Sequence, residues 1–174
     1  AMTAAYVMMF NELKHTISDR QLKKIYDAYT HGSFNDNGKW MEPEELCNYI
    51  GGYFSEIAYD VKNGCAIRLS YAMNKSGFLI PHVKGTYKGG DGKWYFIKAL
   101  DMSKYLRRYR VTTVSEAKQA KNGLVYLHPS NSWVSEQISG HVDVVYRHKW
   151  GSYYRYKNYY GGSPYKGFKT EIYH

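Results

Sequence analysis

Residues 63–74 read NGCAIRLSYAMN, and the rest of the fold can be built outward from them. Asn63-Gly64 breaks the preceding pattern, and residues 65–75 then predict a helix that ends at Gly77, a residue suited to a C-cap. Apolar side chains occur almost all round this helix. Such a helix is typical of the centre of a domain, so we expect Cys65 to begin a buried element.

Two helices are predicted before this segment. Ser18 can cap a helix that runs to about Tyr29, and Pro43 can open another from Glu42 to about Ala58. The pair Gly51-Gly52 weakens the second helix midway. Residues 31–39 are expected to form a loop.

After Gly77 the pattern shifts towards strands and short helices. Alternating apolar residues predict an antiparallel sheet behind the helices, which is the α+β pattern. We therefore expect one domain over residues 1–174, with 1–60 as an extended helical region and 61–174 holding the cysteine helix and the sheet. Strands are predicted at 78–83, 93–98, 123–128, 140–148, 152–160 and 167–174, and short helices at 101–109 and 115–121.

Composition points to an anionic partner. The chain has 174 residues, a net charge of +9 and 20 tyrosines, and residues 102–174 hold 12 basic but only 4 acidic residues. Such a balance suits a nucleic acid, an acidic polymer or an acidic protein, and predicts binding that weakens as salt rises. No apolar run of eighteen residues and no signal-peptide pattern occurs, so we expect neither a membrane span nor a leader.

Cys65 is the first candidate for chemistry. At the first turn of a helix, free backbone N–H groups and the helix dipole favour a thiolate, and the same N–H groups can receive an oxyanion. The alternative is a small core residue, which we also expect for Cys47 beside Ile50. One disulfide between the two cysteines is a further option.

His141 and Asp143 form the second candidate. On a strand they point to the same face, and an imidazole can take the proton of a thiol while a third group orients its ring. An exposed polar strand face explains the pair equally well. A His-x-Asp pair can also bind zinc, but no third ligand with suitable spacing follows, so we expect no metal site.

Three blocks of sequence follow in order. They are NGCAIRLSYAMN at 63–74, WYFIKA at 94–99 with Met102 to Leu106, and GLVYL at 123–127 with Trp133 and then SGHVD at 139–143. Across about residues 60–146, their order and spacing resemble the type VI secretion amidase effectors of the fourth family. Residues 1–60 look like an extension, and the tyrosine-rich C-terminus matches poorly.

The resemblance implies a papain-like fold, in which the cysteine helix packs on an antiparallel sheet that carries the histidine. It implies a cysteine amidase that cuts peptidoglycan stem peptides between D-glutamate and meso-diaminopimelate, without a cofactor. It also implies an antibacterial toxin that is made in the producer cytoplasm. The type VI secretion machinery then injects it into the periplasm of rival bacteria, and a cognate immunity protein neutralises it.

By the same resemblance, Cys65 is the nucleophile and His141 the general base and later acid. The family has an aspartate well downstream of the histidine, whereas this chain has none after Asp143. Asp143 is therefore the expected acidic partner, with Ser152 or Asn158 as alternatives that orient the ring. Two further residues are candidates for substrate binding. Arg68 can bind a carboxylate or serve a structural role, and Trp133 can line the groove or anchor a loop.

Two other functions fit parts of the sequence. A non-enzymatic module could hold nucleic acid through phosphate contacts and stacking on tyrosines, although no nucleic-acid motif occurs. A degenerate family member could bind the cell wall without cutting it, which only the missing downstream aspartate favours. Neither alternative needs a reactive Cys65.

Overall fold

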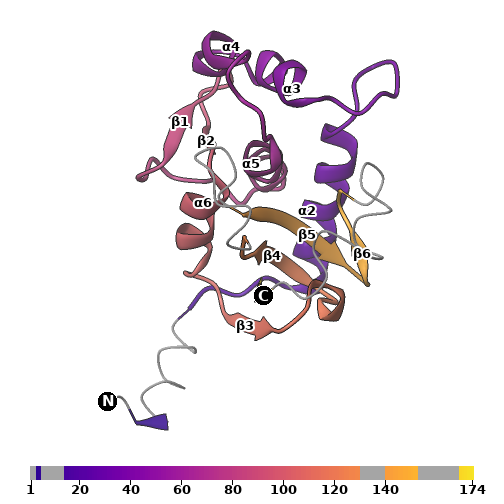
Figure 1. Ribbon diagram of the computed structural model, residues 1–174, viewed down its shortest axis with the longest axis vertical. Coiled ribbons are helices and arrows are strands. Elements are labelled where there is room, and N and C mark those ends of the chain that lie inside the picture. Colours follow the sequence, from indigo (N-terminus) through magenta and orange to yellow (C-terminus); the bar gives the residue numbers. More distant parts are fainter. Residues whose placement is uncertain (1–2, 5–13, 130–139, 153–168) are drawn as a thin grey trace.

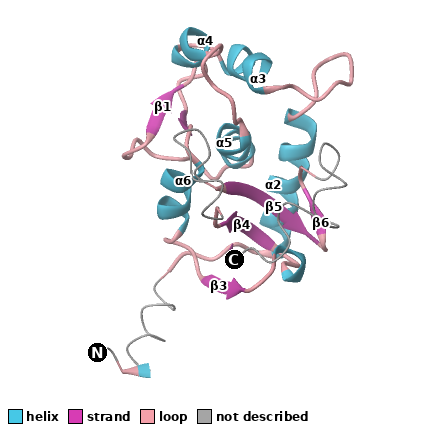
Figure 2. Ribbon diagram, viewed as in Figure 1, coloured by secondary structure: helices cyan, strands magenta, loops and turns pink. Residues whose placement is uncertain are grey.

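The computed structural model describes residues 3–4, 14–129, 140–152 and 169–174, and it has helices first in the chain and the larger sheet last (Figure 1). Helices α3 and α4 lie at one end, the strands β4, β5 and β6 lie towards the other, and α5 lies between them (Figure 2). The predicted α+β class is confirmed. The elements are α2 (Asp19–Gly32), α3 (Pro43–Ile50), α4 (Tyr53–Ile57), α5 (Cys65–Lys75), β1 (Thr86–Lys88), β2 (Trp94–Phe96), α6 (Ala99–Leu106), β3 (Val111–Val114), the 3-10 helix η1 (Ala117–Gln119), β4 (Gly123–Leu127), β5 (His141–Tyr146), β6 (Lys149–Trp150) and β7 (Thr170–Tyr173).

Helix α2 begins where the sequence predicts. The Ser18 hydroxyl accepts a hydrogen bond from the Gln21 backbone N–H at 3.1 Å, and the Gln21 side chain accepts from the Ser18 N–H at 2.8 Å. This reciprocal pair satisfies two N–H groups that a helix start leaves without intrahelical partners. The helix ends three residues later than predicted, at Gly32.

The helix predicted from Glu42 to Ala58 is two helices. Gly51 and Gly52 have φ values of 76° and 60°, which interrupt the helical backbone between α3 and α4. A β-carbon on Gly52 would lie 2.9 Å from the backbone nitrogen of Gly90, so the loop between β1 and β2 passes directly over this turn. The two glycines therefore end one helix and begin another rather than only weakening a single long one.

Helix α5 has the predicted bounds and is central (Figure 1). Nine of its eleven residues are buried. Ala66, Leu69 and Met73 join a core with α2, α6 and the large sheet, whereas Ile67 joins a second core with α3 and α4. The helix is thus packed on several sides, which fixes the position of its first residue, Cys65.

The strand predicted at 78–83 is wrong. The Phe78 N–H bonds the Met73 carbonyl and the Ile80 N–H bonds the Asn74 side chain, so this segment closes the C-terminal end of α5. The strand forms later, as β1, and pairs antiparallel with β2 across the loop Gly89–Lys93.

The larger sheet has the strand order β3-β7-β4-β5-β6, and all its described pairs are antiparallel. The predicted strands at 123–128, 140–148 and 167–174 correspond to β4, β5 and β7, while β3 and β6 were not predicted. Helix α6 runs over Ala99–Leu106 rather than 101–109, and the short helix predicted at 115–121 is the 3-10 helix η1. Except for Ser152, the strand predicted at 152–160 lies outside the described residues.

In the described part of the chain, no helix has the length and apolarity needed to cross a membrane.

Candidate active site

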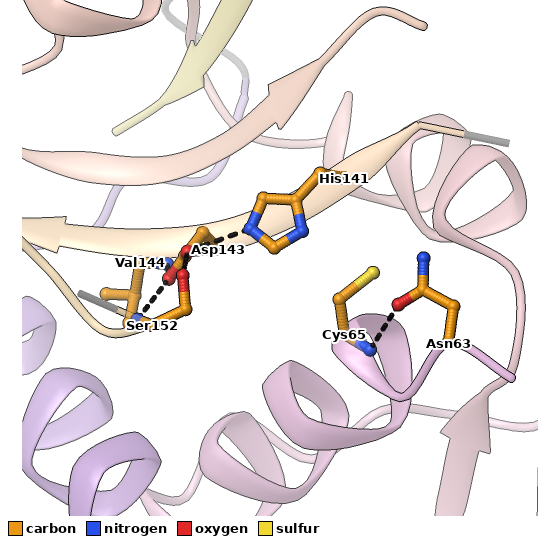
Figure 3. Close-up of polar contacts among 6 residues, drawn as sticks. All are labelled: Asn63, Cys65, His141, Asp143, Val144 and Ser152. Carbon is orange, nitrogen blue, oxygen red and sulfur yellow. Dashed lines mark hydrogen bonds and ion pairs between the residues drawn. The ribbon is translucent and has the colours of Figure 1, made fainter. Parts of the chain in front are cut away.

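Cys65 lies at the start of α5, with 7 % of its surface exposed. Its backbone N–H donates a hydrogen bond to Asn63 Oδ1 at 3.1 Å (Figure 3). From its place in the sequence this N–H can receive an oxyanion, and in the structure it is bonded to the Asn63 side chain. The cysteine side chain points away from the helix end, towards β5.

His141 and Asp143 come together on β5. His141 Nε2 lies 2.9 Å from Asp143 Oδ2, and both side chains are buried. Residues two apart on a strand share a face, and here the two rotamers close the remaining gap. The same-face prediction is confirmed at hydrogen-bond distance.

Asp143 is fixed by donors on both oxygens. Its Oδ1 accepts from the backbone N–H of Val144 at 2.8 Å and of Ser152 at 3.3 Å. Its Oδ2 accepts from the Ser152 hydroxyl as well as facing His141. Ser152, which the sequence offered as a partner for the imidazole, thus contacts the carboxylate that the imidazole contacts. The other alternative, Asn158, lies outside the described residues.

The position of Ser152 depends on the hairpin from β5 to β6. Arg147 and His148 have positive φ values of 48° and 64°, which make a tight two-residue turn. The Gly151 N–H then bonds the Val144 carbonyl at 2.8 Å, and the next residue is Ser152. No sequence signal marked this turn, since Asn and Gly are the residues expected in it.

The imidazole of His141 lies between an acid and a thiol (Figure 3). Burial lowers the pKa of His141, but hydrogen bonds and charge interactions with Asp143 and Cys65 outweigh it and raise the pKa to about 10. The charged imidazolium is therefore favoured at neutral pH. An imidazolium beside a cysteine side chain is the arrangement that activates a thiol as a nucleophile.

Arg68, one turn after Cys65, is 4 % exposed. Its Nη2 donates to the Met41 carbonyl at 2.8 Å, and its guanidinium lies 4.1 Å from the centre of the Trp40 ring. These contacts tie the start of α5 to the loop before α3, which agrees with the structural alternative. Trp133 lies outside the described residues.

Cys47 is fully buried in α3 and is not disulfide-bonded to Cys65. Burial raises the pKa of its thiol to about 11. It therefore has the inert character expected of a core cysteine.

The described residues contain no group of three or more His, Cys, Asp or Glu side chains that could hold a metal ion. What they bring together is a cysteine, a histidine and a carboxylate in line, from two elements far apart in the chain. This order suits nucleophilic attack by sulfur with proton transfer through the imidazole.

Comparison with known proteins identifies a family for the part of the chain that holds these residues. Residues 61–163 match the family model described as "Type VI secretion system (T6SS), amidase effector protein 4", or Tae4. This match covers more than half of the chain and contains Cys65, His141 and Asp143. No curated protein sequence matches significantly.

Solved structures of similar fold include Tae4 of Salmonella typhimurium with Tai4, at a TM-score of 0.69 and 20 % identity, over 87 % of this chain and 96 % of that one. The Tae4 effector of Enterobacter cloacae has a TM-score of 0.65 and 18 % identity, over 92 % and 97 %. The effector–immunity complex Tae4–Tai4 of Enterobacter cloacae gives 0.63 and 19 %, over 91 % and 98 %. At such identities the likeness establishes the fold.

Proposed function

The chain belongs to the Tae4 family of type VI secretion amidase effectors, and from this premise we propose that it is a cysteine amidase that cuts peptidoglycan stem peptides between D-glutamate and meso-diaminopimelate. The bond is the one that the family resemblance implies. The observation that carries the catalytic proposal is the line Cys65–His141–Asp143, with the thiol at the start of α5 and the other two side chains on β5 (Figure 3).

In the first half-reaction, the Cys65 sulfur attacks the γ-carbonyl carbon of D-glutamate. The raised pKa of His141 supports an imidazolium at this point, so the ring is ready to act as an acid. When the C–N bond breaks, His141 gives its proton to the departing amine of diaminopimelate. A thioester on Cys65 and a neutral imidazole remain.

In the second half-reaction, His141 takes a proton from a water molecule whose oxygen attacks the thioester carbon. The C–S bond breaks, the D-glutamyl carboxyl is released, and the thiolate–imidazolium pair is restored. The Asp143 side chain holds the ring through Nε2, which leaves Nδ1 to face the sulfur. Ser152 keeps this carboxylate in place.

The remaining site assignments are part of the proposal. Trp133, four residues after the end of the described segment at residue 129, is the candidate for lining the substrate groove. Arg68 is the weaker candidate for substrate contact, because its buried guanidinium already bonds the Met41 carbonyl. Its role in the proposal is to hold the helix that carries the nucleophile.

Delivery and partner follow from the family. We infer that the type VI machinery carries the protein into the periplasm of target bacteria, where its substrate lies. Similar Tae4 structures are complexes with the immunity protein Tai4, which supports a cognate immunity protein for this chain. The basic residues of 102–174 suit an acidic partner surface or the anionic wall.

The test is digestion of meso-diaminopimelate peptidoglycan, with the products identified by mass spectrometry. Wild type is expected to release fragments cut after D-glutamate, Cys65→Ala to release none, and Cys47→Ala to retain activity. Unchanged muropeptides with folded wild type, or full activity in Cys65→Ala, would sink the proposal. Retention of DNA or RNA that survives Cys65→Ala would instead favour the binding module.

Iodoacetamide labelling measures the reactivity of the Cys65 thiol directly. At near-neutral pH we expect it to modify Cys65 and to spare Cys47, whose pKa is raised to about 11 by burial. Peptide mapping of the labelled protein distinguishes the two positions. Equal labelling of both would mean that Cys65 has no special reactivity.

A further inference from the structure

The Asn63 side chain accepts a hydrogen bond from the backbone N–H of Cys65, and it is half-buried beside the nucleophile. A backbone N–H can only donate, so the side-chain atom that faces it at 3.1 Å must be the amide oxygen. This contact therefore settles which way round the amide lies. Its other end, the Nδ2 amine, lies on the same side as the cysteine sulfur (Figure 3).

Attack by Cys65 needs a hydrogen-bond donor for the oxygen of the scissile carbonyl. When the carbon bonds to sulfur, its oxygen becomes negative and lies beside the sulfur, where a fixed donor is most effective. The Cys65 N–H already has an acceptor, in Asn63 Oδ1. Among the described residues, Asn63 Nδ2 has no acceptor of its own, so its hydrogens remain available for a bound substrate.

We propose that Asn63 is a catalytic residue that donates a hydrogen bond from Nδ2 to the oxyanion formed during attack by Cys65. The donor is preorganised, because the amide plane is fixed by the bond to the Cys65 N–H. That bond also polarises the amide and strengthens its N–H donors. The inference rests on the proposed function for the identity of the reaction, and its test below does not need the natural substrate.

A simpler role for Asn63 is to fix the turn that leads into α5, whose N-cap residue is Gly64. Such an Asx-turn uses only the side-chain oxygen, and the Ser hydroxyl can accept the same bond, although more weakly. The amine is what Asn alone supplies. A serine at position 63 therefore keeps an acceptor for the Cys65 N–H and removes the proposed donor.

Asn35, in the loop between α2 and α3, offers a control away from the thiol. Its Oδ1 accepts the backbone N–H two residues on, of Asn37, at 3.0 Å, as Asn63 accepts that of Cys65. Unlike Asn63, it also accepts from the Lys39 N–H and donates from Nδ2 to Glu45 Oε1 at 2.8 Å. This loop is not part of the catalytic line. Asn35→Ser therefore reports what the loss of such an amide does away from the thiol.

Two reagents separate the roles at Cys65. Acylation by p-nitrophenyl acetate passes through a tetrahedral oxyanion, whereas alkylation by iodoacetamide is a direct displacement at carbon without one. Both are measured on wild type, Asn63→Ser and Asn35→Ser, with Cys65→Ala as background, alongside thermal unfolding. Neither reagent needs peptidoglycan, so failure of the wall digestion and failure of this inference are distinguishable.

For Asn63→Ser we expect acylation to slow by at least about tenfold and hydrolysis of the wall by about 100- to 1,000-fold. Alkylation and the unfolding temperature are expected to stay near wild type, and Asn35→Ser to match wild type in both reactions. Wild-type acylation in Asn63→Ser overturns the inference. So does an equal fall in acylation and alkylation, which would mean that Asn63 acts on the thiol or on the fold.

Discussion

At the scale of single residues, His141 is held from two sides. Asp143 faces Nε2 at 2.9 Å, and Cys65 is the other group that favours the charged ring. A single imidazole thus links the acid on its own strand to the thiol on a distant helix. The charge on Asp143 is the part of this arrangement that one substitution can remove without changing its shape.

Asp143→Asn is expected to lower kcat by about 100- to 10,000-fold, because the amide can present its amine to Nε2 and favour the wrong tautomer. The loss of a negative charge also lowers the pKa of His141 below the wild-type value of about 10. The basic limb of the pH–rate profile therefore moves to lower pH. A profile with the same basic limb in both proteins would contradict the role of Asp143.

The free energy of unfolding also depends on the titration of His141. The pKa of His141 is raised from its ordinary value of 6.5 to about 10. Between these two pH values the protein therefore binds a proton when it folds. The resulting contribution to the free energy of unfolding is complete below about pH 6.5 and is lost as pH rises through about 10. In Asp143→Asn the loss should be smaller and should be complete at lower pH, which urea unfolding over this range would detect.

At the scale of elements, the start of β5 depends on Gly140. Its φ of 113° is outside the range that other residues adopt readily. A β-carbon there would lie 2.8 Å from the Leu127 carbonyl oxygen of β4 and 2.7 Å from the Tyr126 hydroxyl. The first residue of β5 after this glycine is His141. A displacement of the backbone at Gly140 therefore moves the residue that carries the imidazole.

Gly140→Ala is expected to lower the free energy of unfolding by about 1–3 kcal/mol and to reduce kcat strongly. Gly38→Ala is the matched control, because Gly38 also has a positive φ, of 72°, but nothing lies within 4 Å of the added carbon. Urea unfolding and wall digestion measure the two effects. If both variants lose activity equally, the contact with β4 is not what positions His141.

The backbone of the turn between β5 and β6 is strained, and we expect that catalysis does not depend on this strain. Arg147 and His148 occupy positive φ, where Asn and Gly are favoured, and the His148 backbone N–H bonds the Lys121 carbonyl at 2.9 Å. The double variant Arg147→Asn with His148→Gly keeps that bond and relieves the left-handed backbone strain, so it should raise the free energy of unfolding by about 1 kcal/mol. Activity should be unchanged, because Ser152 still reaches Asp143; a fall in activity would show that the native pair shapes the site.

The same hairpin shows where sequence reasoning stops. Helix α5 could be predicted to the residue, because its break, apolar pattern and end are all local signals. The contact between Ser152 and Asp143 could not, since it depends on an unmarked turn at Arg147 and His148. Likewise, the break at Gly51-Gly52 could be predicted, but its close packing against the loop at Gly90 could not.

Asn63 illustrates the limit within the site. Its sequence signal, Asn-Gly before a helix, predicted a break in the chain and nothing more. Which atom of its amide faces Cys65 follows from the backbone N–H that it accepts, which only the folded chain shows. By contrast, strand periodicity alone predicts that His141 and Asp143 share a face, although their hydrogen-bond distance of 2.9 Å is seen only in the folded chain.

At the scale of the whole molecule, the high tyrosine count has a structural consequence. Several described tyrosines are core residues: Tyr95, Tyr109, Tyr126 and Tyr173 are each at most 6 % exposed. Burial raises the pKa of Tyr109 and of Tyr126 to about 12, and it raises the pKa of Tyr95 and Tyr173 well above the ordinary range. These phenols stay neutral in the folded protein at pH values where an unfolded chain ionises them.

The fold should therefore lose stability steeply in alkali. A raised tyrosine pKa contributes stability that is complete below about pH 10 and is lost as pH rises towards the folded value of about 12. Each such tyrosine adds about 1.4 kcal/mol per pH unit to the slope. Urea unfolding across this range measures the slope for wild type and for Tyr109→Phe, which should be shallower by one tyrosine. An identical slope in both proteins would mean that Tyr109 ionises alike in the folded and unfolded chains, and that its burial does not govern its titration.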